Sequence, residues 1–95
     1  MVDFSVHLNG YHMDETRMFA LGTLPQKVED ACKASVEIHD RVIDKVRPGV
    51  TSGELFDSSV ELASKLGYGD VYLGPPHSKV RFVGHGVGLE LIEVP

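Results

Sequence analysis

The 95-residue sequence has one cysteine, no tryptophan, no excess of basic residues and no long apolar run. Cys32 has no second cysteine to pair with, so an internal disulfide is excluded and a cytoplasmic location is expected. The net charge of −5 disfavours nucleic-acid binding, which requires a basic surface for the phosphates. No stretch reaches the roughly 18–20 apolar residues of a membrane span, so no membrane partner is expected. With 42% hydrophobic residues, the sequence predicts one small globular unit.

The first strong pattern is a β-hairpin signal near the N-terminus. Asn9-Gly10 separates two predicted strands, one from Asp3 to Leu8 and one from Tyr11 to about Ala20, and both turn residues tolerate the positive φ that a type I′ turn requires. A two-residue loop at this point sets the register of the two strands. Asp3 is then predicted to pair with Thr16.

In that register two carboxylates share one face of the hairpin. Asp3 and Asp14 become diagonal cross-strand neighbours, with backbones about 7–8 Å apart. The opposite face is apolar and comprises Phe4, Val6, Leu8, Tyr11 and Met13. Because neighbouring carboxylates repel unless a cation compensates them, the pattern favours a metal site. The alternative is that both acids are solvated on the wet face of a surface hairpin.

Two helices are predicted next. The first starts near Pro25 and ends at Pro48-Gly49, and apolar or small residues recur along it at three-and-four spacing. Its predicted buried stripe is Val28, Ala31, Cys32, Ser35, His39, Val42, Ile43 and Val46. The second begins with the capping-box spacing of Thr51 and Glu54 and ends at Gly67. Its predicted buried face is Leu55, Phe56, Ser59, Val60, Ala63 and Leu66.

Three side chains in this region can be interpreted as structural or as functional. His39 lies on the predicted stripe, which favours a buried, hydrogen-bonded histidine over a metal ligand. Cys32 is interpreted as a core residue rather than a nucleophile, because nothing near it in the sequence would lower its pKa. His77 lies in the predicted loop 68–78, where it either lines a substrate pocket or faces solvent.

A short strand is predicted over Lys79–Val83, and it leads into Gly84-His85-Gly86-Val87-Gly88. Glycine permits close backbone approach, which suits an imidazole directed into a crowded site. A dinucleotide-binding fingerprint is excluded, since it would need glycine at Leu89.

Taken together, these patterns resemble the pita-bread metallopeptidases: methionine aminopeptidases, Xaa-Pro aminopeptidases, prolidases and the related creatinase. The resemblance rests on Asp3, on Asp14 eleven residues later in a D-x-T-R context, on the two helices and on the G-H-G-V-G segment. It implies an α+β fold, an incomplete pita-bread fold in which a hairpin, two helices and a further strand form an antiparallel sheet packed on helices. Residues 1–95 would be part of the catalytic domain, without its N-terminal part and its C-terminal glutamate-bearing strands.

The resemblance also implies a dinuclear metal site. Asp3, Asp14 and His85 would be ligands, with Asp14 bridging two divalent ions, and oxygen-rich coordination favours Mn²⁺, Co²⁺ or Fe²⁺. The parent protein would hydrolyse N-terminal peptide bonds of a peptide substrate, most like an Xaa-Pro aminopeptidase or dipeptidase. The general-base glutamate would lie beyond Pro95, so weak or no metal binding and no activity are expected of the isolated chain.

One position departs from the family pattern. A histidine commonly follows the G-H-G histidine by seven residues, and here that position is Ile92. An alternative reading is therefore a catalytically eroded pita-bread module that acts in binding, and a third is a small acidic domain without metal. A cut fold also leaves strand edges unpaired, which predicts homo-oligomers through those edges.

Overall fold

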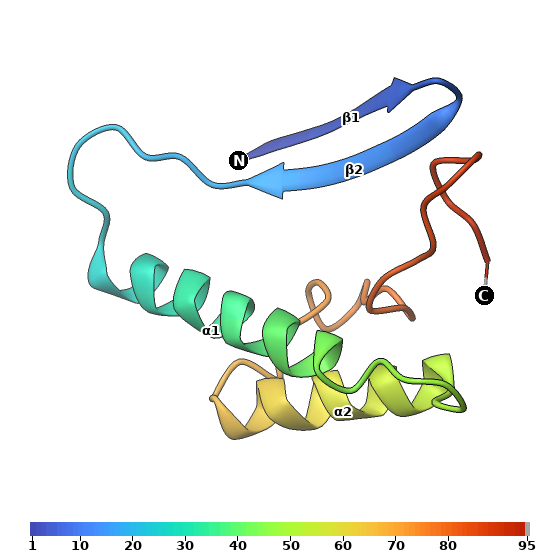
Figure 1. The fold of residues 1–95 in the computed structure, drawn as a ribbon. Helices are drawn as coiled ribbons and strands as arrows, with labels where there is room; N and C mark the ends of the chain where they lie inside the picture. Colours follow the sequence, from blue (N-terminus) through green and yellow to red (C-terminus); the bar gives the residue numbers. More distant parts are fainter. Residues whose placement is uncertain (95) are drawn as a thin grey trace. The chain divides into compact units, whose positions relative to one another are not determined.

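The computed structural model describes residues 1–94 and has an α+β arrangement, as predicted. Its elements, in chain order, are β1 (Val2–Leu8), β2 (Tyr11–Arg17), α1 (Gln26–Ile43) and α2 (Ser52–Lys65) (Figure 1). The chain divides into two compact units. One unit combines residues 1–24 with the segment from Gly84 onward, and the other comprises Pro25–Val83.

None of the helices described within residues 1–94 has the length and apolar character of a bilayer-spanning segment.

The hairpin forms in the predicted register. Asn9 has φ of 52° and Gly10 has φ of 84°, which are the positive values of a type I′ turn. β1 and β2 pair antiparallel, with Asp3 opposite Thr16 and Ser5 opposite Asp14. The diagonal relation of Asp3 and Asp14 follows from this register, because their side chains leave the sheet on the same face.

All seven residues of β1 are exposed, on both faces of the ribbon. Leu8 and Tyr11, the pair next to the turn, are 76% and 64% exposed, and Val6 is 55% exposed. The described part of the chain therefore leaves the apolar face of the hairpin in contact with solvent.

The second unit has its core between α1 and α2. Ile38, Val42 and Ala63 form the buried cluster, and Ala34 is buried on the same line of α1. Partly buried apolar side chains surround the cluster, namely Leu55, Leu62, Leu66, Tyr72 and Val83.

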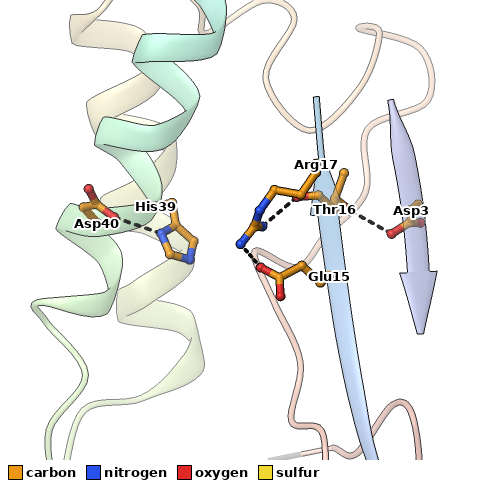
Figure 2. A network of polar contacts seen from close by, with 6 residues as sticks. All are labelled: Asp3, Glu15, Thr16, Arg17, His39 and Asp40. Carbon is orange, nitrogen blue, oxygen red and sulfur yellow. Dashed lines mark hydrogen bonds and ion pairs between the residues drawn. The ribbon is translucent and has the colours of Figure 1, made fainter. Parts of the chain in front are cut away.

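The predicted buried stripe of α1 was wrong over part of its length, where the buried residues lie one position before the predicted ones. Ala34 and Ile38 are buried, whereas Ser35 and His39 are exposed. Residues 34, 38 and 42 follow one i, i+4 line, and small or branched apolar side chains on that line allow close helix packing. The His39 side chain is 71% exposed and its Nδ1 lies 3.1 Å from Asp40 Oδ1, so the interpretation of His39 as a buried histidine is corrected (Figure 2).

The start of α2 is confirmed by its capping box. The Thr51 hydroxyl accepts from the Glu54 N–H at 3.2 Å, and the Glu54 carboxylate accepts from the Thr51 N–H at 2.8 Å. Ser59 and Ala63, two residues of the predicted buried face, are fully buried. Val60 of the same predicted face is 36% exposed, so it lies at the margin of the core.

The predicted strand over Lys79–Val83 is not formed. This segment is irregular, and its Val80 N–H donates to the Leu73 carbonyl at 3.0 Å. A strand requires a neighbouring strand to pair with, and the sheet within residues 1–94 consists of β1 and β2. Beyond that sheet, an isolated antiparallel bridge joins Gly86 and Glu93.

The capping box makes the stability of α2 depend on pH. The Thr51 backbone N–H, followed by its hydroxyl, holds the pKa of Glu54 below its ordinary value of 4.5. Because the folded-state pKa is lowered, this stabilisation is present above the ordinary pKa and is lost as pH falls through the lowered one. Replacing Glu54→Gln should flatten the pH dependence of the unfolding free energy as pH falls below 4.5.

Urea denaturation followed by circular dichroism measures this dependence. Thr51→Ser serves as the matched control, since it keeps both groups that bind the carboxylate and should keep the wild-type slope. An unchanged slope in the Glu54→Gln variant would contradict the assignment.

Candidate metal centre

Asp14 and His85, predicted as ligands of one metal centre, lie together in the first unit. His85 Nε2 is 3.5 Å from Asp14 Oδ2, and the two side chains are 23% and 30% exposed. Asp14 comes from β2, whereas His85 belongs to the segment that follows the second unit in sequence. The structure thus brings one end of the chain to the carboxylate near the other end.

The orientation of the His85 ring is set by a neighbouring carbonyl. Its Nδ1 lies 3.0 Å from the Gly86 oxygen. A carbonyl only accepts hydrogen bonds, so the ring donates through Nδ1–H in this contact, and Nε2 is the ring nitrogen that faces Asp14. This is the arrangement usual for a metal-binding histidine, in which the second ring nitrogen donates to an acceptor that fixes the ring.

Asp3 is held by its cross-strand partner. The Thr16 hydroxyl donates to Asp3 Oδ1 at 2.7 Å, which Figure 2 shows as a link between the two strands. In a two-residue hairpin the pair at the turn is hydrogen-bonded and pairs then alternate, so Asp3 and Thr16 form a non-hydrogen-bonded pair with close side chains. The Arg17 side chain turns instead to Glu15 and to the Thr16 carbonyl (Figure 2).

The His85 segment is attached to the edge of β2. The His12 N–H donates to the Gly88 carbonyl at 2.7 Å. His7 and His12 form a non-hydrogen-bonded pair, so the His12 N–H points away from β1 and is available to a third segment. Sequence reasoning missed this contact, although the glycine at position 88 was a signal that another backbone segment lies close by.

Close approach is found at two of the three glycines around His85, whereas a Cβ atom at Gly84 would have nothing within 4 Å. A Cβ atom at Gly86 would lie 3.1 Å from the Glu93 carbonyl oxygen, and one at Gly88 would lie 2.8 Å from a Glu93 carboxylate oxygen. The partner in both cases is Glu93, which was not predicted. An alanine at either glycine would displace it.

His7 and His12 form a pair of rings on the face of the hairpin that carries Asp3 and Asp14. The His7 and His12 ring centroids are 5.7 Å apart and tilted by 45°. His12 Nδ1 is buried and has no hydrogen-bond partner among the described residues. The close contact follows from their register, because side chains in a non-hydrogen-bonded pair approach each other most closely.

The chemistry of the donor atoms fits a divalent ion. Ligand atoms about 2.0–2.2 Å from one ion can be as far apart as Asp14 Oδ2 and His85 Nε2 are here. Carboxylate oxygen and imidazole nitrogen suit Mn²⁺, Co²⁺, Fe²⁺ or Zn²⁺. Within residues 1–94, no group of three or more His, Cys, Asp or Glu side chains is arranged to hold a metal ion. The structure therefore presents a two-donor pair, with Asp3 on the same face of the hairpin.

His77, the predicted substrate-binding residue, lies in an exposed turn of the second unit. The turn is closed by the Ser78 N–H, which donates to the Pro75 carbonyl at 2.8 Å. A role of His77 in binding substrate stays a prediction.

A family model described as "Metallopeptidase family M24" matches residues 1–95. The chain therefore belongs to metallopeptidase family M24, which is the pita-bread family that its motifs resemble.

Relatives of two kinds are similar to the whole chain or nearly so. The Xaa-Pro dipeptidase of Pyrococcus furiosus is 33% identical over 95 residues, which are 100% of this chain and 25% of the relative. The putative dipeptidase YkvY of Bacillus subtilis is 34% identical over 95 residues, 100% of this chain and 24% of the relative. Methionine aminopeptidase 1D of Arabidopsis thaliana is 34% identical over 87 residues, 92% of this chain and 23% of the relative. The chain thus spans about a quarter of the length of these relatives.

Proposed function

We propose that this chain supplies three metal ligands of a dinuclear exopeptidase that removes the N-terminal residue from peptides, most like an Xaa-Pro aminopeptidase or dipeptidase. The observation that carries the proposal is the Asp14–His85 pair, in which Gly86 holds the imidazole with Nε2 toward the carboxylate. The M24 family match and the Xaa-Pro dipeptidase relative support the choice of reaction.

In the proposed centre, Asp3, Asp14 and His85 hold two divalent ions, Mn²⁺, Co²⁺ or Fe²⁺. Bound ions of this kind lower the pKa of a bound water and polarise a scissile carbonyl. The contribution of this chain is to position ligands. Thr16 keeps Asp3 turned toward β2, and the Gly86 carbonyl orients the His85 ring so that Nε2 faces Asp14.

A hybrid protein tests the proposal. Residues 1–95 of this chain would replace the matching 95 residues of the Pyrococcus furiosus Xaa-Pro dipeptidase. We expect the folded hybrid to hydrolyse an alanyl-proline dipeptide when Mn²⁺ or Co²⁺ is added and to stop when the metal is chelated. Circular dichroism establishes that the hybrid is folded. A folded hybrid with neither metal binding nor hydrolysis would contradict the proposal.

A second candidate function is binding without hydrolysis. It is favoured by Ile92, an apolar residue that is 64% exposed at the position where relatives of this fold commonly carry a histidine. For this eroded module we expect the folded hybrid to bind Co²⁺ with no turnover of the dipeptide. Replacing Ile92→His distinguishes a weakened enzyme, which should regain activity, from such a module, which should not.

The isolated 95-residue chain should bind metal only weakly. Two carboxylates and one imidazole leave most coordination positions of two ions to water, so we expect dissociation constants for Mn²⁺ above the micromolar range. Isothermal titration calorimetry measures them. Stoichiometric binding of two ions at micromolar Mn²⁺ would contradict this prediction.

We further propose a cytoplasmic protein that self-associates. The single cysteine, Cys32, is free, which agrees with a reducing compartment. β1 and β2 form a two-stranded sheet within residues 1–94, and unpaired strand edges favour pairing with another copy. We expect dimers or larger species in sedimentation velocity at micromolar concentration. Replacing Val6→Lys on β1 should reduce them, and a wild-type chain that sediments as a monomer would contradict the proposal.

A further inference from the structure

Glu93 closes the loop that carries the candidate ligand His85. Its backbone bonds Gly86 in both directions: the Gly86 N–H donates to the Glu93 carbonyl at 3.0 Å, and the Glu93 N–H donates to the Gly86 carbonyl at 2.9 Å. Gly86 adjoins His85 in sequence and also accepts from its ring. The backbone of Glu93 is thus hydrogen-bonded to the residue that follows His85 in sequence.

The Glu93 side chain folds back over the same loop. Its Oε1 accepts from the Leu89 N–H at 2.8 Å and from the Glu90 N–H at 3.2 Å. A carboxylate that accepts two backbone N–H groups makes charge-assisted bonds, which are stronger than neutral ones. The loop is further tightened by the Gly88 N–H, which donates to the Glu90 carbonyl at 3.1 Å.

Only glycine permits this arrangement. At Gly88 a Cβ would meet Glu93 Oε1 at 2.8 Å and Oε2 at 2.9 Å, both inside the closest approach of real Cβ atoms. The carboxylate therefore occupies the space that a side chain at position 88 would need. The Gly88 carbonyl in turn accepts from the His12 N–H, which attaches the loop to β2 two residues before Asp14.

We propose that Glu93 is a positioning residue for the metal centre: its carboxylate holds loop 86–93 closed, and the closed loop holds His85 beside Asp14. The significance for catalysis rests on the proposed function, whereas the closure of the loop does not. Glu93 itself is not assigned as a ligand, because its carboxylate is turned to the Leu89 and Glu90 amides.

Amide hydrogen exchange of the ¹⁵N-labelled 95-residue chain tests the closure. In the Glu93→Ala variant we expect the Leu89 and Glu90 amides to exchange about tenfold faster, and the His12 amide to follow, because the loop no longer clamps β2. Glu93→Gln keeps an oxygen acceptor without the charge, so it should restore about half of the lost protection on a logarithmic scale. Amides of α1 are the internal reference.

Co²⁺ affinity of the hybrid described above tests the positioning of His85. Glu93→Ala should weaken Co²⁺ binding, followed by visible absorption, by about tenfold, and Glu93→Gln should recover part of it. The matched control is Glu90→Ala, which removes an exposed carboxylate from the same loop and should leave the Co²⁺ affinity and the exchange of the Leu89 and His12 amides unchanged.

The two measurements separate the possible failures. Unchanged Leu89 and Glu90 exchange in the Glu93→Ala variant would overturn the proposal. Faster exchange with unchanged Co²⁺ affinity would also overturn it, since the loop would then not position His85. If the wild-type hybrid bound no Co²⁺, the proposed function would fail, and the exchange rates would still decide whether Glu93 closes the loop.

Discussion

Replacing Ile92→His in the hybrid enzyme is expected to raise kcat for an alanyl-proline dipeptide by about 100-fold. By resemblance to the family, a histidine at this position donates a hydrogen bond to the tetrahedral intermediate, and losing one such donor typically lowers kcat by about 10²–10³. Ile92 is 64% exposed, so an imidazole fits without displacing core side chains. Because the donor acts on the intermediate, KM should change much less than kcat.

Leu89→His is the matched control for this substitution. Leu89 lies in the same loop and is 65% exposed, so the variant introduces the same side chain with the same change in hydrophobicity. We expect its kcat to equal that of the unmodified hybrid. Equal activities of the Ile92→His and Leu89→His variants would show that position 92 has no part in catalysis, and an inactive Ile92→His hybrid that still binds Co²⁺ would support the binding module.

Replacing Asp14→Asn should lower metal-dependent hydrolysis by the hybrid by at least about 1,000-fold. The amide has nearly the shape of the carboxylate, so the hairpin should fold, but it lacks the negative charge that would bind and bridge two cations. The negative charge that faces His85 Nε2 at 3.5 Å is lost with it. Co²⁺ stoichiometry, measured by visible absorption, should fall together with kcat.

Glu15→Gln is the control for Asp14→Asn. Glu15 is the next residue of β2, and its side chain leaves the opposite face of the hairpin, where it pairs with Arg17. An ion pair of this exposure contributes about 0–1 kcal/mol to stability, so the variant should keep both fold and activity. If Asp14→Asn retained more than about a tenth of the wild-type activity, Asp14 would not be a bridging ligand.

Much of the fold could be predicted because its signals are local. Asn9 and Gly10 tolerate the positive φ of a type I′ turn, and a two-residue loop leaves one register for every pair from Leu8–Tyr11 to Val2–Arg17. Likewise Thr51 and Glu54 satisfy each other's groups within one helical turn. In both cases the residues that decide the structure lie within a few positions of one another.

Other features depended on contacts between distant parts of the chain. Which stripe of α1 is buried was settled by packing against α2, where Ile38 and Val42 meet Ala63 and His39 stays exposed. Both stripes have helical spacing, so periodicity alone could not choose between them. The segment 79–83 has strand-like residues, but it pairs with no strand of the described chain.

The sequence by itself determined the hairpin, its register, the two helices and the membership of family M24, because each of these is encoded by short-range patterns or by motifs at fixed spacing. The family resemblance implied that Asp14 and His85 meet, but tertiary structure alone decided that Nε2 of His85 is the atom facing Asp14, that Gly88 binds the edge of β2 and that Glu93 closes the loop. The contacts of His85 and Gly88 with β2 join segments that are about 70 residues apart, and the contacts of Glu93 lie within a loop that folds back on itself. Their geometry therefore depends on how the chain closes in space, which no local pattern encodes.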